Sequence, residues 1–117
     1  MFTLRNIALA AIAGILGCIV NSLAITAMAG ADPIPLILSA GRQFWSIVFA
    51  MALIPIFARM SGVTAWIVGF LALNALASLS AVYIWGAGAP WGFILTVNGA
   101  YALVAVAVYV LGRPKYP

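Results

Sequence analysis

The side chains that most often perform acid–base chemistry or bind metals are nearly missing from the sequence. Its 117 residues include no histidine, one cysteine, Cys18, and one acidic residue, Asp32. General acid–base and nucleophilic catalysis rely mainly on these residue types. Metal and haem sites take their ligands from the same set. We therefore expect no enzyme, no catalytic residues and no metal or haem cofactor.

Charge is scarce as well. Charged residues make up 5% of the chain, compared with about a quarter in soluble domains. The five basic residues are scattered rather than clustered, which argues against nucleic-acid binding. Hydrophobic residues make up 68% of the chain and the mean hydropathy is +1.27. The composition predicts an integral membrane protein whose first partner is the lipid bilayer, and the size and composition suit a bacterial inner membrane.

Four apolar segments are long enough to cross a bilayer, which takes roughly 20 residues each. Glycine and proline in the connections end each helix. The sequence predicts an all-α fold, a single transmembrane domain over residues 1–117 that forms an antiparallel four-helix bundle. The expected helices cover residues 6–29, 39–58, 63–85 and 91–111.

The first apolar segment also has features of a cleavable signal peptide. Arg5 precedes it, and Ala27, Met28 and Ala29 near its end match a small-residue cleavage site. We interpret it as a membrane helix. In a four-crossing arrangement most basic residues then fall on the side opposite Asp32, which predicts that both termini are cytoplasmic. These basic residues are Arg5, Arg59, Arg113 and Lys115.

Arg42 lies close to the start of the second segment, and its depth depends on where that helix begins. If Ser39 caps the helix, Arg42 lies in the first turn, where its side chain can extend outward to the headgroups or pair with Asp32. If the helix begins near Leu36, Arg42 lies about 9 Å below its end and should face a partner or a cavity. Pro55 should loosen the other end of this helix.

Amide and hydroxyl side chains on the other segments map to the middle or outer half of the membrane. With Arg42 they could form a polar layer that lines a small pocket for an anionic or carbonyl-bearing ligand, such as a lipid headgroup or a quinone. Simple hydrogen bonds between helices, worth about 0.6 kcal/mol each, are the preferred interpretation for the asparagines. The residues of the predicted layer are Asn21, Gln43, Asn74, Ser78 and Asn98.

The first segment carries small residues at helical spacing, which let another helix approach closely. This predicted packing face consists of Ala10, Gly14, Gly17, Cys18 and Ser22. Its partner can be another segment of the chain or another protein. Larger apolar residues are expected to face lipid, namely Ile47, Phe49, Leu53, Ile54, Phe57, Leu71, Leu73, Val104, Val106 and Val108.

The length and the four expected crossings resemble those of small multidrug transporters. Those transporters rely on a glutamate in the first membrane helix, and this chain has no glutamate. Proton-coupled antiport through a carboxylate is therefore not expected. The sequence favours a structural or accessory subunit that associates with other membrane subunits or with copies of itself. The alternative is a small oligomeric transporter or channel for an anionic or neutral solute that uses the Arg42 and asparagine layer.

Overall fold

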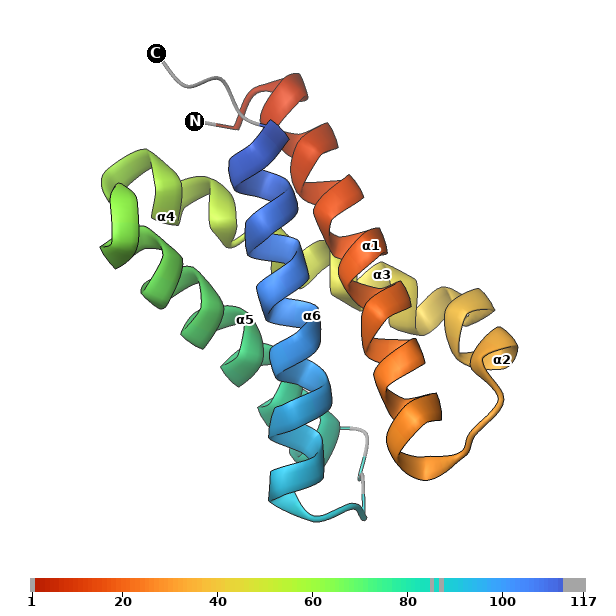
Figure 1. Ribbon diagram of the computed structural model, residues 1–117. Helices are drawn as coiled ribbons and strands as arrows, with labels where there is room; N and C mark the ends of the chain where they lie inside the picture. The colour runs from red at the N-terminus through yellow and green to blue at the C-terminus, as the bar shows by residue number, and fades with distance from the viewer. Residues whose placement is uncertain (1, 85, 87, 113–117) are drawn as a thin grey trace.

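A computed structural model describes residues 2–84, 86 and 88–112. In this part of the chain all regular structure is helical, and no strand occurs. Arg113, Lys115 and position 85, the expected end of the third membrane helix, lie outside the described residues. The helices, shown in Figure 1, are α1 (Leu4–Ala29), α2 (Pro33–Leu38), α3 (Ala40–Ala50), α4 (Leu53–Arg59), α5 (Gly62–Tyr83) and α6 (Trp91–Gly112).

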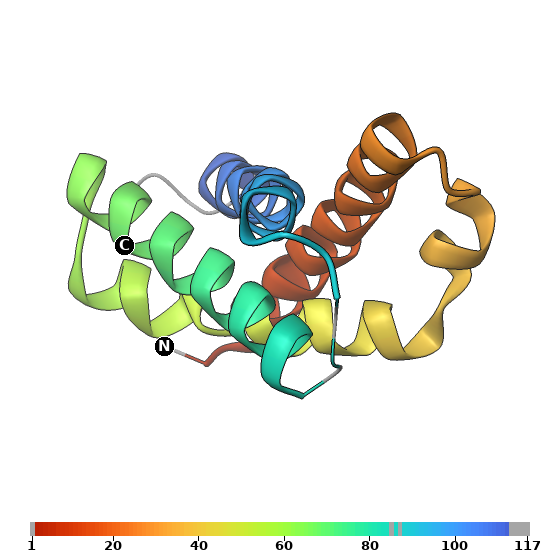
Figure 2. The same ribbon diagram turned by 90° about the horizontal axis from the view of Figure 1, so that it is seen from below.

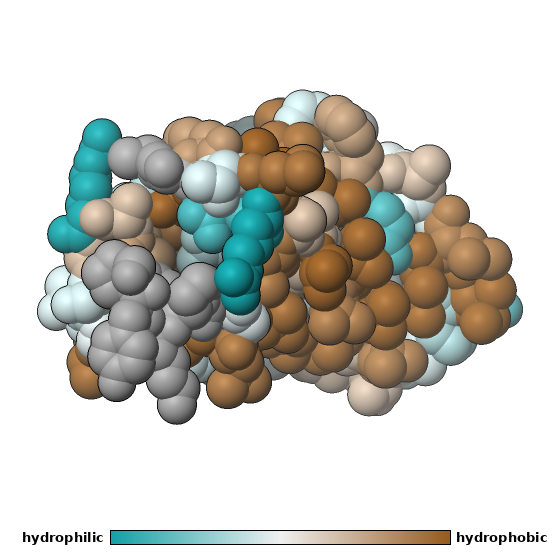
Figure 3. All heavy atoms as spheres, turned by 90° about the horizontal axis from the view of Figure 1, so that it is seen from above, coloured by the Kyte–Doolittle hydropathy of each residue, from teal (hydrophilic) through white to brown (hydrophobic). Residues whose placement is uncertain are grey.

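Four spans among the described residues are long and apolar enough to cross a membrane. They are α1, the combined segment Ala40–Arg59, α5 and α6. Less than half of each span is buried inside the molecule. Many large hydrophobic side chains are correspondingly exposed. In Figure 3, seen from the end that holds the start of α1, brown residues cover much of the centre and right of the view. Such a surface is suited to contact with lipid.

A short helix, α2, occupies part of the region expected to be a connection. Asp32 precedes it, and its Oδ1 accepts a hydrogen bond from the backbone N–H of Ile34 at 3.0 Å. Pro33 begins the helix, where a missing N–H does no harm. Ser39 has an extended backbone that ends α2, and its side chain accepts from the N–H of Arg42 at 3.3 Å. The cap at Ser39 therefore starts α3 at Ala40.

The second span is not the single helix expected over residues 39–58, because Pro55 interrupts it. Proline has no N–H to donate to the carbonyl of Met51, four residues earlier. That carbonyl accepts from Ile54 at 3.2 Å instead, and Ala52 donates to Phe49 at 3.0 Å. Both hydrogen bonds join residues three apart, as in a 3₁₀ turn, and this tighter turn separates α3 from α4.

Helices α1 and α6 lie side by side and run in opposite directions (Figure 1). Asn21 is hydrogen-bonded to Asn98, and Gly17 lies against Tyr101. The α3–α4 segment crosses this pair obliquely along one side, as Figures 1 and 2 show. Helix α5 packs against α6. The orientation of the molecule in a membrane, and hence the predicted cytoplasmic location of both termini, stays a prediction.

The hydrophobic core lies where α4, α5 and α6 meet α1. Part of the surface predicted to face lipid lies in this core instead, at exposed fractions of 6% or less, namely Leu53, Ile54, Phe57, Leu73 and Val106. The prediction was wrong on α4 because this helix crosses the molecule obliquely and turns its apolar side chains inward. Leu73 of α5 and Val106 of α6 lie in the same core. Leu71, in contrast, is 58% exposed.

Candidate functional site

The side chain of Arg42 points toward α1. Its Nη2 donates to Oδ1 of Asn21 at 2.6 Å and to Oγ of Ser22 at 3.2 Å. Its Nε donates to the backbone carbonyl of Leu36, in α2, at 3.2 Å. The guanidinium is therefore held among three elements of the fold, and these contacts turn it inward rather than outward to headgroups.

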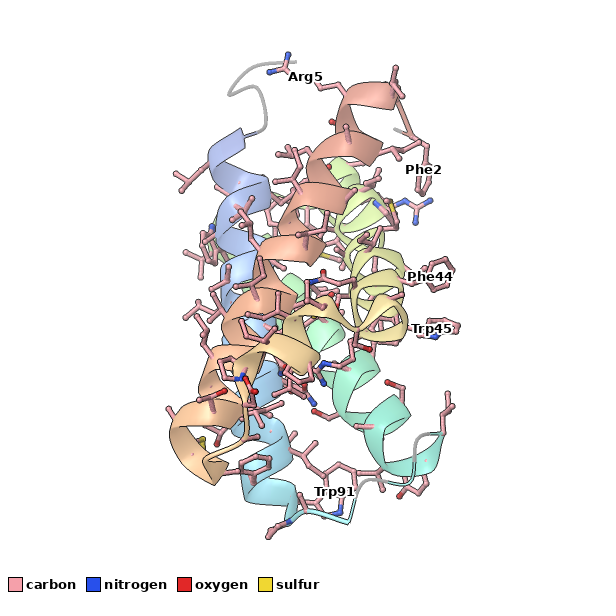
Figure 4. All side chains as sticks on the ribbon, turned by 90° about the vertical axis from the view of Figure 1, so that its right-hand side faces the viewer. Phe2, Arg5, Phe44, Trp45 and Trp91 are labelled. Atoms are coloured by element: carbon pink, nitrogen blue, oxygen red, sulfur yellow. The ribbon has the colours of Figure 1, made fainter. Side chains whose placement is uncertain are left out.

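Arg42 lies deeper than its place in the first turn of α3 implies. Its partner Asn21 is eight residues before the end of α1 at Ala29, and Asn98 is seven residues after the start of α6 at Trp91. At ~1.5 Å per residue, both asparagines are about 10 to 12 Å from these helix ends. Figures 1 and 4 show the cause, because α2 and the start of α3 lie beside the middle of the molecule.

The positive charge of Arg42 has no carboxylate partner among the described residues. Asp32, the only acidic side chain of the chain, caps α2 through Ile34 and does not pair with Arg42. The oxygen atoms that accept from Arg42 belong to an amide, a hydroxyl and a backbone carbonyl, which are all neutral. The ion pair between Asp32 and Arg42 that the sequence suggested is therefore not formed.

Hydrogen bonds link Arg42 to polar side chains of all the other spans. Nδ2 of Asn21 donates to Oδ1 of Asn98 at 3.0 Å. Nδ2 of Asn98 donates to Oγ of Ser78 at 3.2 Å, and this hydroxyl donates to Oδ1 of Asn74 at 2.9 Å. We call these five residues the polar chain. It connects α3, α1, α6 and α5 in that order.

Gln43, the remaining member of the predicted layer, does not join the polar chain. Its Nε2 donates to the carbonyl of Ile37 at 2.9 Å, so the side chain binds α2 rather than α1. Within the described part of the chain, its Oε1 is buried and has no hydrogen-bond partner. The structure therefore separates Gln43 from the side chains with which it was grouped.

A cavity of about 110 Å³ lies beside the polar chain, between α3 and α5 and against α1 and α6. Its lining residues are Asn21, Arg42, Trp45, Ser46, Phe49, Ala77, Ser80, Ala81, Asn98 and Tyr101. We call this cavity the Arg42 pocket. Its lining combines polar side chains from all four spans with aromatic rings of α3 and alanines of α5.

Sequence analysis missed three polar residues of the Arg42 pocket, Ser46, Ser80 and Tyr101. The hydroxyl of Tyr101 donates to the carbonyl of Ser46 at 2.6 Å, which joins α6 to α3. Helical spacing could have indicated two of them. Ser46 follows Arg42 by four residues and Tyr101 follows Asn98 by three, and such pairs share a helix face.

The small residues of α1 bring α3 and α6 close enough to form this site. A Cβ atom added at Gly14 would lie 2.6 Å from the carbonyl oxygen of Ser46, and one at Gly17 would lie 2.6 Å from Cδ1 of Tyr101. Both helices therefore approach α1 at glycines. The other members of the predicted packing face are also buried, namely Ala10, Cys18 and Ser22.

The described residues include no group of three or more histidine, cysteine, aspartate or glutamate side chains that could hold a metal ion. The pocket instead offers a guanidinium, amides and hydroxyls, which suit the binding of oxygen atoms. Comparisons with protein-family models, with curated proteins and with solved structures found no match for the chain. The function is therefore argued from the site itself.

Proposed function

We propose that this small membrane protein binds a ligand with an anionic or carbonyl oxygen in the Arg42 pocket. The supporting observation is the unpaired charge of Arg42, which faces a cavity and is hydrogen-bonded to Asn21, about 12 Å from the end of α1. A charge at such a depth is costly unless it has a partner or reaches water. A ligand that brings a negative or partly negative oxygen supplies the missing partner.

The pocket favours binding over catalysis, because its side chains provide no general base near neutral pH. Binding of this kind suits a small oligomeric transporter or channel for an anionic or neutral solute. We place the protein in a bacterial inner membrane as an antiparallel bundle with cytoplasmic termini. The distribution of basic residues supports this orientation.

The accessory-subunit role, which the sequence favours, rests on the apolar outer surface of the helices. A lipid bilayer alone can cover that surface. Other membrane subunits or further copies of the chain are not needed to cover it. The pocket, in contrast, is a feature that a purely structural subunit does not require. The site therefore supports ligand binding more directly, and the accessory role stays a prediction.

Native mass spectrometry of the full chain, extracted in a mild detergent, tests this proposal. We expect a co-purifying small molecule at a fixed ratio to the protein, lost in Arg42→Gln and retained in the control Arg59→Gln. Arg59 is a suitable control because it lies at the end of α4 and does not line the pocket. A bound molecule that persists in Arg42→Gln would contradict the proposal. Constant association with another protein chain and no small ligand would favour the accessory subunit.

A further inference from the structure

Two hydrogen-bond donors of the Arg42 pocket are unused. Arg42 uses Nε and Nη2 for its contacts, and its Nη1 makes no hydrogen bond to any described residue. Nη1 is not among the buried unpaired atoms, so it remains accessible. The Oγ of Ser46, one helical turn further along α3, is likewise accessible and unpaired within the described residues. A charged donor and a hydroxyl donor therefore lie on the same face of α3.

The cavity limits how much of a ligand can enter. Its volume of about 110 Å³ is well below the roughly 300–1,000 Å³ of pockets that enclose a whole drug-sized ligand. A small headgroup, such as a carboxylate or a phosphate, suits a pocket of this size better than a whole ligand does.

Two of the aromatic side chains that line the pocket, Trp45 and Phe49, belong to α3. Trp45 lines the cavity and is also 39% exposed. Figure 4 shows Trp45 and its neighbour Phe44 extending away from the body of the molecule. Phe49 packs against Trp45, with their ring centroids 5.8 Å apart. An apolar chain attached to a group in the pocket can therefore continue along these rings into lipid.

We infer that the ligand of the Arg42 pocket is a membrane amphiphile with a small anionic oxygen headgroup on an apolar chain. The headgroup accepts from Nη1 of Arg42 and Oγ of Ser46, and the chain lies along Trp45 and Phe49. This inference rests on the proposed function and narrows it to an anion, because a neutral carbonyl would leave the arginine charge uncompensated. The headgroup is a carboxylate or a phosphate, which share this chemistry.

Binding of three matched probes to the full chain in a neutral detergent tests the inference. The probes are decanoate, its methyl ester and decyl phosphate, measured by native mass spectrometry at a pH where the carboxylate is ionised. We expect decanoate or decyl phosphate to bind about ten-fold or more tightly than the ester, since hydrogen bonds to charged groups are the stronger ones. Tighter binding of decanoate would indicate a fatty acid as the natural ligand, and tighter binding of decyl phosphate would indicate a phospholipid.

Variants locate the binding site. We expect Arg42→Gln to weaken binding of the preferred anion about ten-fold or more, and Ser46→Ala to weaken it by a smaller factor. Arg59→Gln should leave it unchanged. Ser46→Ala removes a hydroxyl that makes no hydrogen bond within the described residues, so this variant should fold even if Arg42→Gln does not.

The outcomes separate this inference from the proposed function. Equal binding of decanoate and its ester, with Arg42 still required, would overturn the anionic headgroup and leave a ligand pocket in place. Anion binding that neither Arg42→Gln nor Ser46→Ala changes would overturn the inferred site. Absence of any adduct, for the probes and for molecules from the native membrane, would overturn both.

Discussion

Nη2 of Arg42 donates to Oδ1 of Asn21 at 2.6 Å, and this contact joins the first turn of α3 to α1 in the interior of the molecule. The same asparagine donates to the backbone carbonyl of Val97 at 2.8 Å and to Asn98. One buried amide thus connects the arginine to α6. The pocket depends on this arrangement because Asn21 holds the guanidinium at the cavity.

Asn21→Ala should destabilise the protein by about 1–3 kcal/mol, because it leaves partners of a buried amide unsatisfied. Asn74→Ala is the matched control, since Asn74 lies at the other end of the polar chain. We expect Asn74→Ala to lower the free energy of unfolding by less. Far-UV circular dichroism during denaturation in mixed micelles measures this free energy for both variants. An equal decrease for Asn74→Ala and Asn21→Ala would contradict the central place of Asn21.

Gly14→Ala should destabilise the protein by about 1–3 kcal/mol, because the new methyl group overpacks the contact with α3. A Cβ at Gly14 would lie 2.6 Å from the carbonyl oxygen of Ser46, and backbone cannot move aside as a flexible side chain can. Gly41→Ala is the control, because no described atom beyond its chain neighbours and the nearby backbone of its own helix lies within 4 Å of its added Cβ. It should be neutral or stabilising, since alanine favours helix over glycine. The same denaturation measurement applies, and equal effects would argue against close packing at Gly14.

Leu53→Ala and Leu71→Ala distinguish core from lipid-facing positions. Leu53 is fully buried and Leu71 is 58% exposed. We expect Leu53→Ala to cost about 2–5 kcal/mol through the cavity it leaves, and Leu71→Ala to cost much less because lipid or detergent fills the space. Thermal unfolding in detergent checks the difference. The reverse order would support the lipid-facing location of Leu53 predicted from sequence.

Reporter fusions at the C-terminus test the orientation in the membrane. We expect a green fluorescent protein fusion to be fluorescent and an alkaline phosphatase fusion to be inactive, because the basic residues predict a cytoplasmic C-terminus. Reducing the charge bias by Arg59→Glu, which leaves Arg5, Arg113 and Lys115 on the same side, should increase the fraction of inverted molecules. An active phosphatase fusion to the unaltered chain would refute the predicted orientation.

The number of membrane spans could be predicted from sequence, because hydropathy over some 20 residues is a local property. The polar residues of the candidate site could also be singled out, since amides and an arginine are conspicuous in apolar helices. Which of them meet could not be predicted. Gln43 follows Arg42 directly, yet the side chain of Gln43 binds α2 alone, whereas that of Arg42 binds both α2 and α1.

The break at Pro55 was indicated by the residue itself, but its consequence for packing was not. An oblique α4 places Leu53, Ile54 and Phe57 in the core. The lipid-facing prediction failed there because a helix loosened at Pro55 does not by itself show which side of α4 meets the other helices. Spacing along the helices would have indicated Ser46 and Tyr101, once a polar face had been recognised.

The sequence by itself determined that this chain forms four apolar spans with no histidine, one cysteine and one acidic residue, because composition and hydropathy are properties of single residues and short windows. Only the tertiary structure decided that Arg42 lies inside the molecule, between Asn21 and a small pocket. The depth and direction of a side chain depend on how helices cross, and the crossing results from glycine contacts, the α2 segment and the Pro55 break together. The charge of one arginine acquires its proposed role from that geometry.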